Sequence, residues 1–335
     1  MGRGRPQRRD ARGMTARRTL LIAAAGTLAA PVLCAQTGWT PTRTVRIVVP
    51  YGPGGGADTT SRLIAGPMGV ALGQTVVVEN RPGAGASLGA QEVARSAPDG
   101  HTLLMDAMSH FVTPVLMRLP IDYSTAFAPL SLVTALPHVL LVPIASSARD
   151  VASLVAEIRA RPGQIAFGTS GNGTGGHLAA VMLARRAGLD VLNAPYRGIG
   201  PALQDLIAGR LGFAFATVAS AMPLVRGGNS RAIGVSSLQR VPVLPDVPTV
   251  AEQGYPGFEM DEWNGLLLPA GMPPNIVAAL SAAVAHAVRD PTVRERIAAI
   301  GAILVGSDPQ RFAAYLSSKG PAIAQLVREE RITLE

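Results

Sequence analysis

The amino-acid sequence predicts an α/β fold built mainly on parallel strands. Around residues 45–66, 75–94 and 164–187, a short apolar strand is followed by a glycine-rich loop and then by a helix. Strands that alternate with helices in this way form parallel sheets covered by helices. The 335 residues are 48% hydrophobic and 16% charged, which is enough apolar material for the full core of one or two such domains.

Residues 1–35 are predicted to be a cleaved signal peptide that directs the protein to the periplasm. A basic start precedes a short apolar stretch, 19–35, which is too short for a spanning helix with ordinary flanks. We expect cleavage after Ala35. The pair Arg17–Arg18 leaves twin-arginine and Sec export both open, and either Met1 or Met14 could be the start.

The charge of the chain does not indicate nucleic-acid binding. Residues 1–18 hold seven arginines and one aspartate, a net charge of +6, so only about +2 of the formal +8 belongs to the rest of the chain. Cys34 is the one cysteine and lies in the predicted signal peptide. The mature protein is therefore expected to have no disulfide, zinc site or thiol nucleophile.

The first strand–loop–helix unit contains a candidate anion site. Ile47–Val49 is predicted as a buried strand, Gly52–Gly56 as a tight loop, and Asp58–Ser61 as the source of a side-chain cap for the next helix. Free backbone N–H groups and the positive end of a helix bind carboxylates and phosphates. Taken alone, this segment fits an unliganded turn better than a site.

The second unit repeats the arrangement. The strand 75–79 leads into the loop 80–86, and Ser87 is expected to cap the next helix. The strand 101–105 follows and is succeeded by the polar pair Ser109–His110. Because ligands of open α/β sheets lie beyond the carboxyl ends of the strands, these segments are predicted to meet at one edge.

The third unit carries the loop Thr169–His177. Gly171, Gly173 and Gly176 match G-x-G-x-x-G, so a dinucleotide site is an alternative, but this is not the first unit and Asp190 precedes the next strand. The loop hydroxyls suit a small carboxylate at least as well. His177 could donate to an anion, although a structural role is more common for such a histidine. No catalytic or metal-binding constellation is evident.

The remaining segments continue the alternation, and the last three of their helices are assigned to packing alone. We expect helices at 151–160, 201–208, 276–288, 291–300 and 309–330, strands at 191–193, 211–217 and 231–236, a proline-rich crossing at 241–248, and extended chain at 263–265 that re-enters the first half.

Several long motifs, in order, carry a family resemblance. They are VRIVVPYGPGGGAD (45–58), GQTVVVENRPGAGASLG (73–89), APDGHTLLM (97–105), SH (109–110), FGTSGNGTGGHLA (167–179), APYRG (194–198), LPDVPTVAEQGYPGFE (244–259) and WNGLLLPAGMP (263–273). From about Trp39 to Leu326, the chain resembles the periplasmic receptors of tripartite tricarboxylate transporters, also called Bug-type receptors. It departs from the family pattern at Tyr51, at Gly52–Pro53 and at Ala216.

The resemblance implies a two-lobed periplasmic binding protein, type II-like, with the ligand cleft between the lobes and a crossing-strand hinge. Lobe 1 is expected to span 37–139 and 264–335, and lobe 2 to span 140–263, with hinge segments at 139–144 and 256–265. The contacts carried over by position are Tyr51, Gly55, Asp58, Ala84, Gly85, Ala86, Ser109, Thr169, Ser170, His177 and, more weakly, Trp263.

The implied function is that of a monomeric receptor that binds a small carboxylate without a cofactor. The lobes close on the ligand and deliver it to the membrane permease subunits of the transporter. Two alternatives stay open: an exported α/β enzyme that uses the 171–176 loop, and an orphan receptor that signals to a sensor kinase.

One expectation concerns the type of acid. Related receptors often have an acidic residue where this chain has Ala216, in the strand 211–217 of the second half. An ammonium group that loses its water needs a carboxylate or several carbonyls facing it. Ala216 therefore predicts a preference for a carboxylate without an α-amino group. The alternative is that Ala216 is simply a core residue and that Asp58 or water meets the ammonium.

Overall fold

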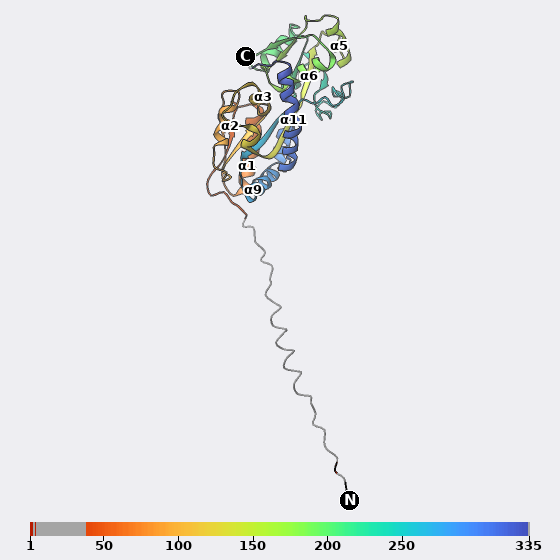
Figure 1. The fold of residues 1–335 in the computed structure, drawn as a ribbon. Coiled ribbons are helices and arrows are strands. Elements are labelled where there is room, and N and C mark those ends of the chain that lie inside the picture. The colour runs from red at the N-terminus through yellow and green to blue at the C-terminus, as the bar shows by residue number, and fades with distance from the viewer. Residues whose placement is uncertain (3, 5–37, 334–335) are drawn as a thin grey trace. The chain divides into compact units, whose positions relative to one another are not determined.

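The computed structural model describes residues 1, 2, 4 and 38–333, and Gly38–Glu335 forms one compact unit (Figure 1). Apart from residues 1, 2 and 4, the predicted signal peptide lies outside the described residues. Within those residues, no single helix is long and apolar enough to cross a membrane. The pair α9 (Pro274–Ala287) and α10 (Pro291–Ala299) passes on length and composition only when taken together, and it is bent by 70°.

The first sheet has six strands in the order β11-β4-β10-β3-β1-β2. Its parallel part combines β1 (Val45–Val49), β2 (Val76–Asn80) and β3 (Thr102–Asp106), and β10 (Glu262–Pro269) runs antiparallel between β3 and β4 (Phe127–Leu136). The short β11 (Ile303–Leu304) lies on the outer side of β4. Its helices are α1 (Gly56–Leu72), α2 (Ser87–Ala94), α3 (Ser109–Leu116), α4 (Tyr123–Ala126), α9, α10 and α11 (Pro309–Glu329).

The second sheet has five strands in the order β7-β6-β8-β5-β9. The strand β6 (Ala166–Thr169) is parallel to both β7 (Leu192–Pro195) and β8 (Phe213–Thr217), whereas β5 (His138–Pro143) is antiparallel to β8 and to β9 (Ser230–Val235). Its helices are α5 (Val151–Arg159), α6 (Gly175–Ala187), α7 (Ile199–Ile207) and α8 (Val218–Arg226).

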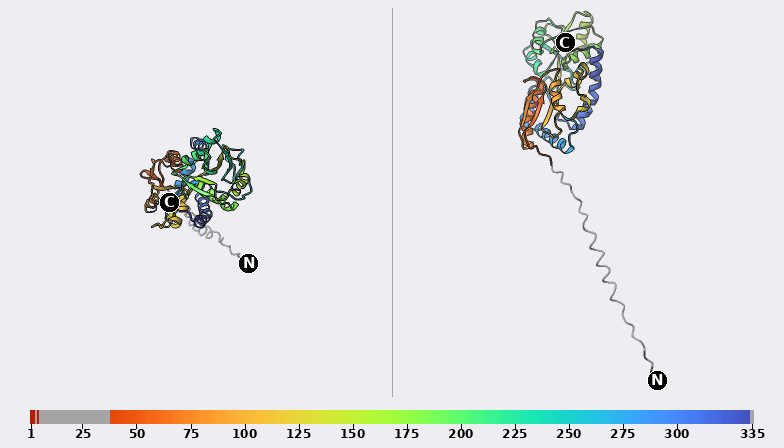
Figure 2. Two further views of the ribbon diagram at one scale, coloured as in Figure 1. Left: turned by 90° about the horizontal axis from the view of Figure 1, so that it is seen from above. Right: turned by 60° about the vertical axis from the view of Figure 1, so that its left-hand side comes forward.

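The chain passes between the two sheets twice. It leaves the first sheet at Pro137, between β4 and β5, and it returns through 236–261 into β10. The two further views also show the last helix, α11, running alongside both groups of elements (Figure 2). Its C-terminal turn reaches the second sheet's helices, where Glu329 pairs with Arg185 of α6. The lobe boundaries given above remain a prediction.

The central strands of the sheets are buried because helices cover them. All five residues of β3 are buried, which is typical of a parallel strand with helices on both faces. Around Trp263, the side chains of Phe111, Phe312 and Tyr315 form an aromatic cluster between β10, α3 and α11. This cluster fixes α3 and α11 against the strand that re-enters the first sheet.

Two of the predicted helix caps were wrong. Helix α1 begins at Gly56 with Gly55 as its N-cap, so Asp58–Ser61 lie inside the helix. Helix α2 has Ala86, not Ser87, as its N-cap, and Ala86 is in the left-handed conformation. In both cases the glycine-rich loop continues directly into the helix without a side-chain cap.

Candidate functional site

The helices that follow parallel strands share one feature: in none of them does the side chain of the N-cap residue accept a hydrogen bond from the first turn. This holds for α1, α2, α3, α6, α7 and α8. By contrast, an aspartate side chain caps each of four other helices: Asp122 for α4, Asp150 for α5, Asp290 for α10 and Asp308 for α11. At these helix starts, the backbone N–H groups that no N-cap side chain occupies can donate to other acceptors, and the helix dipoles favour negative charge there.

The uncapped ends are gathered at two sheet edges by topology. Because β1, β2 and β3 are parallel, their carboxyl ends lie on one edge, and the same is true of β6, β7 and β8. The edges touch. A Cβ placed on Gly173, in the loop after β6, would lie 3.0 Å from Cγ1 of Val112 in α3.

At the first edge, Asp106 organises two of the predicted contacts. Its Oδ1 accepts hydrogen bonds from the Tyr51 hydroxyl (2.7 Å), the Ala107 amide (2.9 Å) and Ser109 Oγ (3.1 Å), and its Oδ2 lies 3.1 Å from Nδ1 of His110. Burial and the charge of Asp106 raise the pKa of Tyr51 above its usual range, so the phenol stays protonated. Asp106 was not predicted as a site residue.

Asp58 holds the first glycine-rich loop in place through the hydrogen bonds of its buried carboxylate. Its carboxylate is 3% exposed and accepts hydrogen bonds from the Gly54 amide (2.9 Å), Asn80 Nδ2 (2.9 Å) and the Arg62 guanidinium. Burial opposes ionisation, but these hydrogen bonds outweigh it and lower the pKa of Asp58. The carboxylate is therefore ionised and engaged inside the protein, while Gly55 lies exposed in the loop that it supports.

The second loop is held in a left-handed backbone conformation. Gly83, Ala84, Gly85 and Ala86 have φ values of 133°, 46°, 60° and 71°. Left-handed alanines are strained, and such strain persists only where the surroundings enforce it. Here Thr113 of α3 donates a hydrogen bond of 2.6 Å to the Gly85 carbonyl oxygen. The three predicted contacts of this loop are thus tied to the middle of α3, the helix that begins with Ser109.

At the second edge, the hydroxyls of the loop 169–177 form hydrogen bonds within the loop itself. Thr174 Oγ1 accepts from Ser170 Oγ (3.2 Å) and donates to the Gly171 carbonyl oxygen (2.8 Å), and the Gly171 amide donates to Thr169 Oγ1 (3.3 Å). Together these bonds fix the loop that leads into α6.

His177 closes the same loop. Its Nδ1 accepts a hydrogen bond of 3.1 Å from the Gly173 amide, and burial lowers the pKa of His177 to about 4. The imidazole is therefore neutral at neutral pH and carries its proton on Nε2. The donor that remains for another group is Nε2–H.

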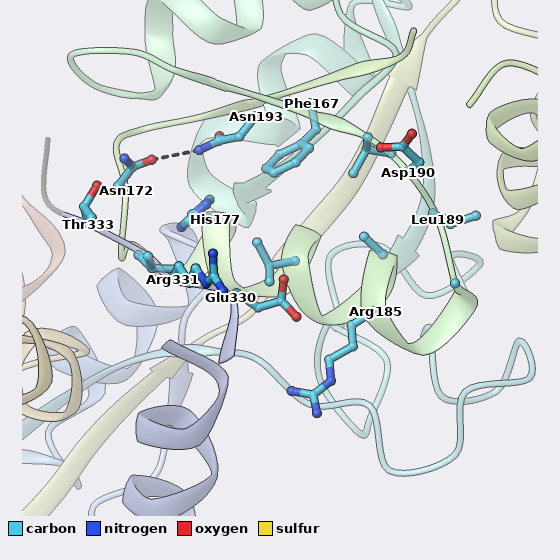
Figure 3. Close-up of a pocket in the computed structure, with 15 residues that line it drawn as sticks. Phe167, Asn172, His177, Arg185, Leu189, Asp190, Asn193, Glu330, Arg331 and Thr333 are labelled. Atoms are coloured by element: carbon cyan, nitrogen blue, oxygen red, sulfur yellow. Dashed lines mark hydrogen bonds between the residues drawn. The ribbon is translucent and has the colours of Figure 1, made fainter. Parts of the chain in front are cut away.

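A pocket of about 710 Å³ lies between α6 and the end of the described chain (Figure 3). His177, Phe167, Arg185 and Arg331 line it, and a hydrogen bond of 2.8 Å joins Asn193 to Asn172 at its rim. His177 is the one predicted contact among its lining residues, so this pocket does not coincide with the predicted site.

Trp263 and Ala216 both belong to the core. Trp263 is fully buried in the aromatic cluster, and its Nε1 has no hydrogen-bond partner among the described residues. This burial argues against a direct ligand contact. Ala216 is 1% exposed, pairs with Val139 in the second sheet and packs in its core. The argument that Ala216 forms an uncharged wall of the site was therefore wrong.

An acid does lie where the two edges meet, and it was not predicted. Glu262, the first residue of β10, accepts hydrogen bonds from the Met108 amide (2.9 Å), the Trp263 amide (3.3 Å) and the Gly175 amide. Met108 precedes Ser109 at the start of α3, and Gly175 is the first residue of α6. Glu262 keeps only a small part of its contact with solvent. This burial raises the pKa of Glu262 to about 7.

The part of the chain that the structure describes contains no group of three or more histidine, cysteine, aspartate or glutamate side chains that could hold a metal ion. The polar groups assembled at the two edges are backbone amides, hydroxyls, a neutral imidazole and a few buried acids. Such a set is suited to holding a small anion by hydrogen bonds.

Comparison with known proteins identifies the family. The model of the tripartite tricarboxylate transporter family receptor matches residues 60–330. Protein BugT of Bordetella pertussis is 35% identical over 313 residues, which cover 92% of this chain and 95% of that protein.

Solved structures agree in fold. The periplasmic binding protein BugD is 32% identical with a TM-score of 0.71, covering 86% of this chain and 98% of that one. MatC from Rhodopseudomonas palustris, with bound malate, is 34% identical with a TM-score of 0.72 (86% and 99% covered). Rpa4515 of R. palustris, with adipate, is 30% identical with a TM-score of 0.75 (88% and 99% covered).

These matches confirm the predicted fold class, an α/β two-lobed periplasmic binding protein. The related structures are of solute-binding proteins. The chain belongs to the family of tripartite tricarboxylate transporter receptors, the Bug-type periplasmic receptors.

Proposed function

We propose that this receptor binds a small carboxylate between the two sheet edges. The observation that carries the proposal is the gathering of six helix N-termini without side-chain caps at these edges, while four other helices are capped by aspartates. Malate and adipate in the related MatC and Rpa4515 structures support a carboxylate as the ligand class.

In this proposal the ligand is held by hydrogen bonds alone. Backbone amides of the loops around Gly55 and Gly85 provide the anion site of the first sheet, together with the hydroxyl of Ser109. The loop of Thr169 and Ser170 and the Nε2–H of His177 supply donors from the second sheet. Closure then is a population shift towards the state in which both sheets contact the ligand.

The family also supports the proposed route of the ligand. We infer that residues 1–35 are removed during export, that the mature receptor works in the periplasm as a monomer, and that it offers its ligand to the permease subunits of a tripartite transporter. An orphan receptor that signals to a sensor kinase would use the same site and differ only in its membrane partner.

The first test is a thermal-shift screen of the purified protein with malate, adipate, succinate, citrate, benzoate, nicotinate, aspartate and glutamate. Native mass spectrometry of protein purified without refolding identifies any ligand that was retained. At least one acid is expected to raise the melting temperature in a concentration-dependent manner. Absence of any shift and of any retained carboxylate would contradict the proposal.

A matched pair of variants localises the site. Gly55 has an ordinary φ of −74°, and an added Cβ would be 3.8 Å from the nearest atom, the Gly52 carbonyl oxygen, so Gly55→Val is compatible with the fold. The valine side chain would cover the amides at the start of α1, and we expect loss of ligand-induced stabilisation. Ala71→Val, at an exposed position in the last turn of the same helix, is the control and should retain the shift. Equal shifts in both variants would remove this loop from the site.

A further inference from the structure

Glu262 connects the two sheet edges through a single carboxylate. On the first edge, Oε1 accepts from the amide of Met108, the residue that precedes α3. On the second edge, the amide of Gly175 at the start of α6 is a further donor, and a Cβ on Gly175 would lie 3.2 Å from Oε2. The carboxylate therefore lies between two helix N-termini that belong to different sheets.

The titratable groups around Glu262 do not provide it with a positively charged partner. Asp106 faces it from the end of β3, Tyr51 from the loop after β1, and Tyr315 from α11, while Asp261 is its neighbour in the chain. His110 of α3 pairs with Asp106, and Lys319 of α11 pairs with Glu259. His138 of β5, whose ring would lie 2.7 Å from a Cβ on Gly175, donates from Nδ1 to the Met260 carbonyl oxygen.

The direction of the coupling follows from solvation. Burial between the edges disfavours the charged form of Glu262 and raises its pKa to about 7, and the negative charge of Asp106 acts in the same sense. When the edges separate, water reaches the carboxylate and its pKa falls towards the ordinary range. The joined state therefore binds the proton more tightly, so acid favours the joined state and pH values above about 7 favour separation.

We propose that Glu262 takes up a proton when the two edges close, so that the receptor binds its carboxylate ligand together with a proton. The ligand half of this statement rests on the proposed function. Glu262 touches the residue before Ser109 and the start of the helix that follows the 169–177 loop, so a bound carboxylate would bring a second negative charge close to it. Protonation removes that repulsion. The affinity for the ligand would then fall by up to about tenfold for each pH unit above the pKa of Glu262.

The first experiment needs no ligand. In the full chain with Cys34→Ser, which leaves no native cysteine, Val70→Cys in α1 and Leu238→Cys after β9 place spin labels at exposed positions on the two halves. Pulsed electron paramagnetic resonance at pH 5.5, 6.5, 7.5 and 8.5 reports the distribution of distances. We expect the distribution to shift between pH 6 and 8, with a larger share of separated molecules at high pH.

Two substitutions assign the effect. Burial also raises the pKa of Asp261 to about 7, but its partner is Ser236 and not the helix starts, so Asp261→Asn is the matched control. The pH response should persist in Asp261→Asn and disappear in Glu262→Gln. A wild-type distribution that does not change with pH, or a response that survives in Glu262→Gln, would overturn the proposal. If Glu262→Gln does not fold, Asp261→Asn decides the point: a pH response retained in that variant supports the proposal, and its loss overturns it.

The second experiment measures the proton directly. Calorimetric titration with malate at pH 7.5 in phosphate and in Tris, whose ionisation enthalpies differ, gives the number of protons taken up on binding. We expect proton uptake in the wild type and in Asp261→Asn, and none in Glu262→Gln. Binding with the same heat in both buffers would refute the coupling to ligand. No heat with malate or with any acid of the thermal-shift screen would instead count against the proposed function, and the ligand-free series would still decide the role of Glu262.

Discussion

Asp106 is the residue on which the first edge depends. A buried carboxylate is costly unless hydrogen bonds satisfy it, and Asp106 is 1% exposed with donors from Tyr51, Ala107 and Ser109. The same bonds place the Tyr51 and Ser109 hydroxyls next to the start of α3. Its role is to position these hydroxyls, and its loss should affect stability as well as binding.

Asp106→Asn should lower the free energy of unfolding by about 2–4 kcal/mol, because an amide cannot accept all the hydrogen bonds of the carboxylate and turns a donor towards Tyr51 or Ser109. Urea denaturation measures the change. Asp308→Asn is the control, since Asp308 caps α11 at an exposed position and asparagine caps a helix about as well. Equal, small effects of both substitutions would contradict this role for Asp106.

Single residues of the site were only partly predictable from the sequence. Tyr51 and Ser109 follow strand ends, and the strand–loop–helix pattern places such residues at the ligand edge. Asp106 was missed because it is the last residue of an apolar strand, where an acid has no local signal. Glu262 was missed because its donors, Met108 and Gly175, are distant in sequence and meet it only in the folded chain.

At the scale of elements, the start of α6 is positioned by glycine. A Cβ on Gly176 would lie 2.5 Å from the Phe215 carbonyl oxygen of β8, closer than real Cβ atoms approach. The helix can therefore lie directly against the strand only if this residue has no side chain. That close approach brings the N-terminus of α6 to the edge. There the amide of Gly175 donates a hydrogen bond to the carboxylate of Glu262.

Gly176→Ala should destabilise the protein by about 2 kcal/mol or more, because the backbone of α6 or β8 has to move. Val70→Ala is the control: Val70 lies exposed in α1, and alanine has a higher helix propensity than valine, so this change should stabilise the helix by about 0.5 kcal/mol. Thermal and urea unfolding of the two variants should give shifts of opposite sign. Shifts of the same sign would disprove the packing argument.

The sequence pattern predicted the elements better than their connections. The three strand–loop–helix units are observed as β1–α1, β2–α2 and β6–α6. The strand β4 was not predicted from the pattern, and β5 coincides with the hinge segment 139–144 that only the family resemblance implied. Both strands have antiparallel partners far along the chain, β10 for β4 and β8 and β9 for β5. Local patterns do not encode such pairings. The predicted caps failed because glycine-rich loops lead straight into α1 and α2, leaving the amides that a side chain would otherwise occupy.

In the molecule as a whole, two buried histidines and two buried acids make stability depend on pH in opposite directions over the same pH range. Burial lowers the pKa of His138 and of His177 to about 4, and it raises the pKa of Asp261 and of Glu262 to about 7. Between about pH 4.5 and 6.5 the unfolded chain binds more protons at the histidines, so they make stability rise with pH. Over the same range the folded chain binds more protons at the two acids, so they make stability fall with pH.

The two contributions are similar in size, about 1.4 kcal/mol per pH unit for each group, so we expect the wild-type free energy of unfolding to vary little from pH 4.5 to 6.5. In the double variant Asp261→Asn/Glu262→Gln the opposing acids are absent, and stability should rise with pH by up to about 2.8 kcal/mol per pH unit over this range. Urea unfolding at half-unit steps of pH measures both curves. The exposed pair Asp246→Asn/Glu295→Gln serves as the control and should leave the curve flat. A wild type whose stability rises as steeply as that of the double variant would mean that the buried acids do not offset the histidines.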